Sequence, residues 1–165
     1  MKARKTKIPA ESLVNSYLPT DYADAFVCGM SKTSQLTPDD IAVRFWTDFP
    51  AWVSVLFRIR NFLVKFVGLE GSMRSLQEFE ECIRTGGQCG IASVPAKSSN
   101  ETLLLLEDKH LDAYMSVYIE EMNEQKLVYA ITLVHFKNRL GRVYFFFIRP
   151  FHGLIVKKAL EKVVK

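Results

Sequence analysis

The chain has 165 residues, of which 48% are hydrophobic and 24% are charged, and its net charge is +4. This length fits a single domain spanning residues 1–165 with a proper core, and the composition argues against a disordered or fibrous chain. So modest a charge gives no reason to expect a nucleic-acid partner.

Four basic residues gather near the N-terminus, namely Lys2, Arg4, Lys5 and Lys7. We expect residues 1–8 to form a flexible, solvated tail rather than an arm that binds nucleic acid or a membrane surface. No apolar segment follows them, so a secretory signal is not expected. The three cysteines form no C-x-x-C pair, and we interpret them as reduced thiols of a cytoplasmic protein.

The first part of the chain predicts a short helical segment, a strand and a helix. Residues 8–18 favour one or two helical turns, and Tyr22–Cys28 alternates as a strand that ends at Gly29. Thr37 followed by a proline is a typical helix start, with the threonine as the N-cap. That helix should continue to about Thr47.

Two further helices are expected before the hydrophobic pattern changes. Pro50–Val67 has a narrow polar face, with Trp52 among the apolar residues opposite. Arg60 falls on the apolar side, so we expect it to pair with a carboxylate inside or at the rim of the core, and Asp112 is the first candidate. Capping-box spacing predicts a short helix over Ser75–Arg84, which a Gly-Gly pair ends.

The second half of the chain predicts an antiparallel meander of strands. They are Gln88–Val94, Glu101–Glu107, His110–Glu121 and Gln125–Lys137. In the third strand Asp112 and Tyr114 share one face, whereas Ala113 and Met115 share the other. In the fourth strand both faces are apolar, which indicates a central strand covered on both sides or one that lines a cavity.

The C-terminal segment Leu140–Lys165 predicts one long helix with a kink at Pro150. Val143–Ile148 is apolar nearly all round, so we expect the first half of the helix to be inserted into the protein. The second half is amphipathic and should lie on the surface. A membrane span is not expected, because the uninterrupted apolar run is far shorter than about 20 residues.

Four short motifs carry a resemblance to a known group of proteins. They are Tyr22-Ala23-Asp24-Ala25-Phe26, His110-Leu111-Asp112, Leu140-Gly141-Arg142-Val143-Tyr144 and Pro150-Phe151-His152. With the order of the elements, they resemble a bacterial family of unknown function with the START-like, or helix-grip, fold. The resemblance covers most of the chain from about Ile8 onward. Where that family carries Phe-Arg after His-Leu-Asp, this chain has Ala113-Tyr114, so no role of that arginine carries over.

The resemblance implies an α+β fold in which a curved antiparallel sheet wraps around a long, kinked C-terminal helix. Two shorter helices should follow the first strand. The wider superfamily includes carriers of hydrophobic ligands, hormone receptors and polyketide cyclases, so the fold alone does not select a function.

The favoured hypothesis is a non-catalytic module that binds a small hydrophobic ligand between the sheet and the C-terminal helix. The residues expected near the ligand are Trp52, Arg60, Asp112, Tyr114, Tyr129, Tyr144 and His152. Residue by residue, the aromatic members also fit a plain core. Neither the identity of the ligand nor the oligomeric state follows from the sequence.

Two alternatives remain open. One is a cyclase- or hydrolase-type enzyme in which Asp112 orients His110 as a general base, and His152 and His135 are further candidates for its site. A structural hydrogen bond is the commoner role of such a histidine–aspartate pair. The other is an interaction protein with a solid core. The histidines lack metal-ligand spacing, and the glycine-rich segment 86–90 matches no phosphate or dinucleotide motif, so neither a metal nor a cofactor is expected.

Overall fold

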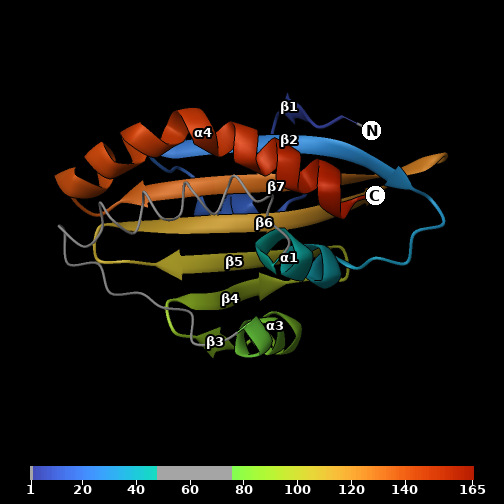
Figure 1. Cartoon of the computed structure of the whole chain (residues 1–165), viewed down its shortest axis with the longest axis horizontal. Coiled ribbons are helices and arrows are strands. Elements are labelled where there is room, and N and C mark those ends of the chain that lie inside the picture. Colours follow the sequence, from blue (N-terminus) through green and yellow to red (C-terminus); the bar gives the residue numbers. More distant parts are fainter. Residues whose placement is uncertain (1, 48–75) are drawn as a thin grey trace.

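The computed structural model describes residues 2–47 and 76–165, which form an α+β fold (Figure 1). Within these residues, seven strands form one antiparallel sheet in the order β1-β2-β7-β6-β5-β4-β3. The strands are β1 (Arg4–Thr6), β2 (Tyr22–Ser31), β3 (Gln88–Cys89), β4 (Ala92–Lys97), β5 (Glu101–Glu107), β6 (Leu111–Glu121) and β7 (Gln125–Phe136). The helices are the 3₁₀ helix η1 (Leu13–Tyr17), α1 (Pro38–Thr47), α3 (Leu76–Thr85) and α4 (Arg139–Val163). The antiparallel sheet and the long C-terminal helix predicted from the sequence are confirmed.

Local signals account for the ends of the short helices. The Thr37 hydroxyl accepts a hydrogen bond from the Asp40 N–H at 3.2 Å, and the Asp40 carboxylate accepts one from the Thr37 N–H at 3.0 Å. At the end of α3, Gly86 has a φ of 75°, and its N–H donates to the Cys82 carbonyl at 3.0 Å. These predicted helices are confirmed, whereas the helix predicted over Pro50–Val67 lies outside the described residues.

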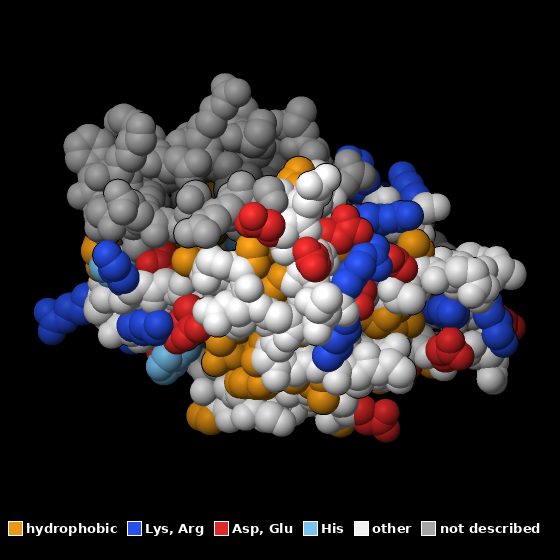
Figure 2. Space-filling view, turned by 90° about the horizontal axis from the view of Figure 1, so that it is seen from below, with side chains coloured by type: hydrophobic (Ala, Val, Ile, Leu, Met, Phe, Trp, Pro, Cys, Tyr) orange, Lys and Arg blue, Asp and Glu red, His pale blue; other side chains and the backbone are white. Residues whose placement is uncertain are grey.

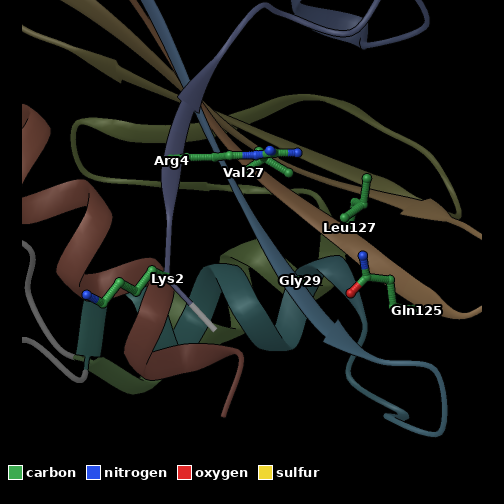
Figure 3. Close-up of a pocket in the computed structure, with 6 residues that line it drawn as sticks. All are labelled: Lys2, Arg4, Val27, Gly29, Gln125 and Leu127. Carbon is green, nitrogen blue, oxygen red and sulfur yellow. The ribbon is translucent and has the colours of Figure 1, made fainter.

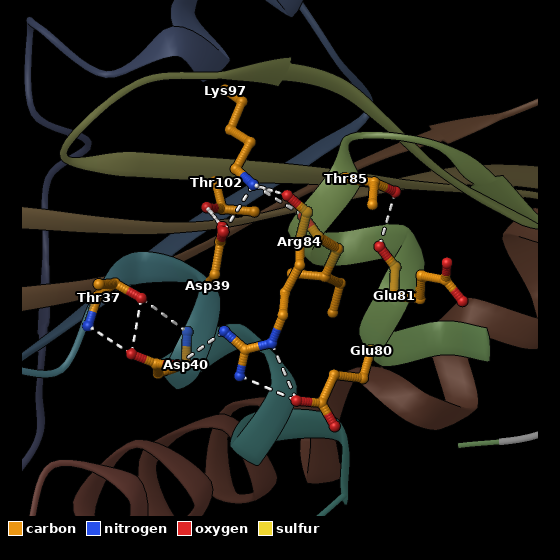
Figure 4. Close-up of polar contacts among 10 residues, drawn as sticks. Thr37, Asp39, Asp40, Glu80, Glu81, Arg84, Thr85, Lys97 and Thr102 are labelled. Atoms are coloured by element: carbon orange, nitrogen blue, oxygen red, sulfur yellow. Dashed lines mark hydrogen bonds and ion pairs between the residues drawn. The ribbon is translucent and has the colours of Figure 1, made fainter. Parts of the chain in front are cut away.

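Ion pairs connect α1 to α3 and to the sheet, as Figure 4 shows. The Arg84 guanidinium lies 3.0 Å from the Asp40 carboxylate, and the Lys97 ammonium lies 2.6 Å from the Asp39 carboxylate. Acidic and basic side chains also lie next to each other on the face seen from the β3 end of the sheet (Figure 2). That face therefore carries mixed charge rather than a field of one sign.

The strand predictions differ from the structure in two places. The single strand predicted over Gln88–Val94 is divided into β3 and β4 by a turn at Gly90, which has a φ of 58°. The first predicted strand does not end at Gly29, because β2 continues to Ser31 and pairs with β7 over its whole length.

The basic N-terminal residues are not the flexible tail that the sequence predicts. Arg4–Thr6 forms β1 and pairs with β2. Just before it, the Ala3 N–H donates to the Glu161 carboxylate at 3.0 Å. The outer edge of β2 offers unpaired backbone groups, and β1 pairs with them while the Arg4 and Lys5 side chains stay exposed to solvent. This edge pairing is a long-range effect that local composition does not reveal.

The sheet has a hydrophobic cluster on each face. The cluster on the α4 side contains Phe26, Met30, Ile41, Phe79, Val128, Ala130, Val156 and Leu160, among others. The opposite cluster contains Val14, Ala25, Leu103, Tyr118, Ile131 and Leu133. Because β7 supplies alternate residues to both clusters, the prediction of a central strand covered on both sides is confirmed.

A buried carboxylate holds η1 against the face of the sheet opposite α4. Glu101 is 1% exposed, and its carboxylate accepts hydrogen bonds from the hydroxyls of Ser12 and Ser116. The Leu13 N–H donates to the other carboxylate oxygen at 2.7 Å, at the start of η1. Glu101 therefore satisfies donors from both the sheet and the helix terminus.

Helix α4 reverses the predicted burial of its two halves. Gly141 and Phe145 are the buried residues before Pro150, whereas the second half buries Val156, Ala159, Leu160 and Val163. The apolar block of the first half is largely exposed, because α4 contacts the sheet along only one of its sides. Pro150 lies inside the helix, and Figure 1 shows α4 bending in its middle. Within residues 2–47 and 76–165, no helix is long and apolar enough to cross a membrane.

Candidate functional site

Four polar side chains meet between the sheet and α4, and we call them the Asp24 cluster: Tyr22, Asp24, Thr132 and His152. Asp24 of β2 lies directly opposite Thr132 of β7, so both side chains face α4. His152 reaches them from the buried side of α4. The Asp24 side chain is 1% exposed and that of His152 is 14% exposed. His152, one of the residues expected near the ligand, therefore lies on the side of α4 that faces the sheet.

The hydrogen bonds of the Asp24 cluster are incomplete. The Tyr22 hydroxyl donates to Asp24 Oδ2 at 2.6 Å. Asp24 Oδ1 lies 3.5 Å from His152 Nε2, yet both atoms are buried without a hydrogen-bond partner. Thr132 Oγ1 is likewise buried without a hydrogen-bond partner. The great majority of buried polar atoms in proteins are paired, so three such atoms on facing elements are an uncommon arrangement.

Aromatic and cationic groups surround the tyrosine of the cluster. The Tyr22 ring centroid lies 4.7 Å from that of Phe145 and 6.0 Å from that of His152, and the Arg149 guanidinium lies 5.5 Å from it. Burial, and then the hydrogen bond to Asp24, raise the pKa of the Tyr22 phenol well above its usual value. Tyr22 is therefore a neutral donor at physiological pH, and it fixes one oxygen of Asp24.

The start of α4 is placed by a close backbone contact. The Asn138 side chain caps the helix and accepts a hydrogen bond from the Gly141 N–H at 3.0 Å. A Cβ on Gly141 would lie 2.1 Å from the His110 carbonyl oxygen, so only glycine lets α4 approach the β6 end so closely. This approach sets the position from which α4 carries Phe145 and His152 across the sheet.

Three of the predicted ligand-contacting residues lie on the wrong face of the sheet. Asp112, Tyr114 and Tyr129 point to the side opposite α4, where Tyr114 and Tyr129 pack against the cluster that contains Val14. The Asp112 carboxylate lies 2.7 Å from the Lys137 ammonium. The prediction grouped them with His152 because strand alternation shows which residues share a face, but not which face the last helix covers.

Each of these three residues has its own partner on that face. The Tyr114 ring centroid lies 4.7 Å from that of Tyr17. The Tyr129 hydroxyl donates to Glu120 at 2.7 Å, and burial together with this bond raises the pKa of Tyr129 to about 12. Of the other predicted residues, Tyr144 is half-buried on α4. Trp52 and Arg60 lie outside the described residues.

The predicted histidine–aspartate pair does not form. His110 forms a hydrogen bond with the Asn138 side chain, while Asp112 forms an ion pair with Lys137. Within the described part of the chain, no hydrogen bond or ion pair joins His110 to Asp112. His135 is 58% exposed and lies 3.3 Å from the Asp21 carboxylate. The geometry of a general base oriented by a carboxylate is therefore absent at His110.

A pocket of about 230 Å³ lies away from the Asp24 cluster, where β1, β2 and β7 meet (Figure 3). It is lined by Lys2, Arg4, Val27, Gly29, Gln125 and Leu127. Val27 alternates with Phe26 and Cys28 of the α4-side cluster, so it faces away from α4. This shallow, open pocket contains none of the unpaired buried atoms, and we assign it no part in the site.

A scan against protein-family models matches residues 17–159 to the family described as Protein of unknown function (DUF2867). The chain belongs to this family. The matched part of this DUF2867 chain includes all four residues of the Asp24 cluster. No curated protein and no solved structure matches the chain.

Three members of the Asp24 cluster were not predicted from the sequence as site residues, namely Tyr22, Asp24 and Thr132. Asp24 is the only charged residue of the apolar strand segment Tyr22–Cys28, and Thr132 is the only serine or threonine in the apolar run Leu127–Val134. A polar residue inside an apolar strand is a signal for a buried polar site. Tyr22 carries no such signal, since tyrosine is common in strands.

Proposed function

We propose that this DUF2867 protein is a START-like module that binds a small lipophilic molecule between the sheet and α4. The Asp24 cluster would hold the polar group of that molecule. The observation that carries the proposal is the set of three buried, unpaired polar atoms on β2, β7 and α4. A bound polar group would supply the hydrogen bonds that these atoms lack in the protein alone.

The cluster favours a ligand group that can both donate and accept hydrogen bonds. Ionised Asp24 can only accept, whereas the Thr132 hydroxyl can do either, and His152 Nε2 can donate or accept according to its tautomer. A hydroxyl or an amide has the required combination. A carboxylate ligand is disfavoured, because its charge would lie next to the buried charge of Asp24.

The apolar body of the ligand has a suitable neighbourhood on β6 and β7. Met115 lies directly opposite Thr132, and Ala113 lies opposite Val134, so these side chains share the α4 side of the sheet. Ala113 and Met115 are only partly buried. An apolar wall beside a few convergent polar groups is typical of small-molecule sites.

The cyclase- or hydrolase-type alternative has less support, because its two residues have separate partners. An interaction protein with a solid core remains an outcome of the test below. Among the described residues, Cys28, Cys82 and Cys89 form no disulfide, which fits a reducing compartment such as the cytoplasm.

Ligand binding can be tested by native mass spectrometry after gentle purification, together with titration of a fluorescent long-chain alcohol. We expect saturable binding that weakens by about tenfold in Asp24→Asn, the loss expected for one hydrogen bond to a charged group. Asp112→Asn is the matched control, since it makes the same change in the same sheet on the opposite face. It should leave the affinity unchanged.

Two results would contradict the proposal. One is a folded wild-type protein with neither a copurified species nor saturable uptake of the probe, which would favour the solid-cored interaction protein. The other is equal affinity in wild type and Asp24→Asn, which would place binding elsewhere. Circular dichroism of each variant separates loss of binding from loss of fold.

A further inference from the structure

The first half of α4 exposes a continuous apolar stripe on the side away from the sheet. Phe146 is 70% exposed and Phe147 is 64% exposed, and their ring centroids lie 5.7 Å apart. The stripe, which we call the α4 outer face, consists of Leu140, Val143, Phe146, Phe147, Phe151 and Leu154. These residues follow one another at helical spacing, and the buried Gly141, Phe145 and His152 lie on the other side.

The second half of the same helix does not continue this stripe. Beyond Leu154, the exposed positions of α4 are taken by lysines, namely Lys158 and Lys162. An exposed run of large apolar side chains is unusual for a globular protein and marks an interaction surface. The change of pattern confines that surface to the part of α4 before residue 155.

The charge of the surrounding segment has one sign. Residues 138–160 contain no aspartate or glutamate, and they contain five cationic residues, which are Arg139, Arg142, Arg149, Lys157 and Lys158. The Arg142 side chain is 72% exposed and lies 3.8 Å from the Asp21 carboxylate, a long distance for an ion pair. An apolar helix face flanked by exposed arginines, on a helix without acidic residues before Glu161, is complementary to an anionic, partly apolar surface.

We propose that the α4 outer face docks on an anionic lipid membrane. The helix would lie in the plane of the interface, with Phe146 and Phe147 at the boundary between headgroups and acyl chains. Arg139 and Arg142 would then meet lipid phosphates. This inference is independent of the Asp24 cluster, which lies on the opposite side of α4.

The charges favour a lipid surface over a second copy of the chain or a nucleic acid. Two copies joined along this face would bring the cations of residues 138–160 together, with no acidic side chain in that segment to pair with them. A nucleic acid requires cations along the middle of its binding surface, but here the middle is aliphatic and aromatic. A lipid interface accommodates both features at once.

Cosedimentation of the full chain with vesicles tests the proposal. One set of vesicles contains phosphatidylcholine alone, and the other an equal mixture of phosphatidylcholine and phosphatidylserine. Wild type should bind the mixed vesicles and release them as salt is raised. We expect Phe146→Ser/Phe147→Ser to weaken binding by more than about tenfold. Arg139→Gln/Arg142→Gln should weaken it by about 25-fold, at roughly fivefold for each arginine.

The matched control is Leu76→Ser/Met122→Ser, which removes two other exposed apolar side chains, 58% and 46% exposed, outside α4. It should bind the mixed vesicles as wild type does. Equal binding to both kinds of vesicle, or wild-type binding by the phenylalanine variant, would overturn the proposal. So would a wild-type dimer that the phenylalanine substitutions convert to a monomer in light scattering, if no vesicle binding accompanies it.

Discussion

Two buried carboxylates, one on each face of the same sheet, differ in how completely they are hydrogen-bonded. Glu101 accepts bonds from two hydroxyls and a backbone N–H. Asp24 accepts one bond from Tyr22, and its second oxygen has no hydrogen-bond partner. Both residues are nearly inaccessible to solvent, since 1% of the whole Glu101 residue and 5% of the whole Asp24 residue are exposed. Two similarly buried carboxylates of one sheet therefore differ in how fully the fold satisfies their hydrogen bonds.

The difference has a physical meaning. A fully satisfied polar network stabilises one arrangement of the core, because every alternative arrangement leaves a group unpaired. A partly satisfied network is retained at a cost in stability, which a bound molecule offsets by making the missing bonds. The following substitutions test whether Glu101 belongs to the first kind and Asp24 to the second.

Glu101→Ala should have the largest effect on stability. It removes the acceptor of the Leu13 N–H and of two serine hydroxyls, and it opens a small cavity under η1. We expect the free energy of unfolding to fall by about 3 kcal/mol, which urea denaturation would measure. Glu101→Gln should lose less, since it keeps the volume and one acceptor. A loss below about 1 kcal/mol for the alanine variant would contradict the structural role.

Gly141→Ala should destabilise the packing of α4 against the face of the sheet that carries Asp24. The new Cβ would lie 2.1 Å from a backbone oxygen, so the start of α4 must move away from His110. We expect a loss of about 2 kcal/mol in the free energy of unfolding and weaker ligand binding. Gly87→Ala serves as a comparison, because its Cβ would meet only the Thr85 hydroxyl, at 3.4 Å. Equal stabilities of the two variants would show that the contact at Gly141 relaxes freely.

Thr132→Val should change stability in the opposite direction from the first two variants. The substitution replaces an unpaired buried hydroxyl with a methyl group of similar shape. We expect the free energy of unfolding to rise by up to about 1 kcal/mol, while affinity for the lipophilic probe falls. Thermal unfolding in the absence of ligand measures the first effect. A clear loss of stability would mean that Thr132 already has a partner in the free protein.

Asp40→Asn should have the smallest effect and shows what an exposed capping carboxylate contributes. Burial would raise the pKa of Asp40, but hydrogen bonds from Thr37 and Arg84 outweigh it and lower the pKa. The ionised form is therefore favoured by folding, so its contribution is present above pH 4 and is lost as the pH falls through the lowered pKa. We expect the free energy of unfolding of wild type to exceed that of the variant by about 0.5 kcal/mol or less at pH 7, with the difference closing as the pH falls through the lowered pKa of Asp40. A stability difference that widens as the pH falls would contradict a lowered pKa of Asp40 in the folded protein.

Much of the fold follows from local sequence signals, whereas the site does not. The Thr37 cap and the alternation of β5 to β7 are properties of neighbouring residues, and they predict those elements within a few positions. The contact between Asp24 and His152 joins two distant parts of the chain. It depends on the register of β2 against β7 and on the side of the sheet that α4 covers, and neither is encoded locally.

The first half of α4 is a second feature that the local sequence does not fully predict. Its apolar composition predicts burial inside the protein, but most of these side chains are exposed. Composition does not reveal whether the protein's own core or another surface covers them. Only the packing of α4 along one side of the sheet separates the buried Phe145 from the exposed Phe146.

The short strands at the two margins of the sheet have a consequence for aggregation. A long unpaired strand can recruit the same strand of another molecule through its free N–H and C=O groups. Here the margins are β1, of three residues, and β3, of two residues, while the much longer β2 and β7 lie inside. Cleaving the chain before Lys7 would leave β2 as a ten-residue margin. The basic N-terminal segment thus covers the middle of the β2 edge, at Ala25–Val27, against intermolecular strand pairing.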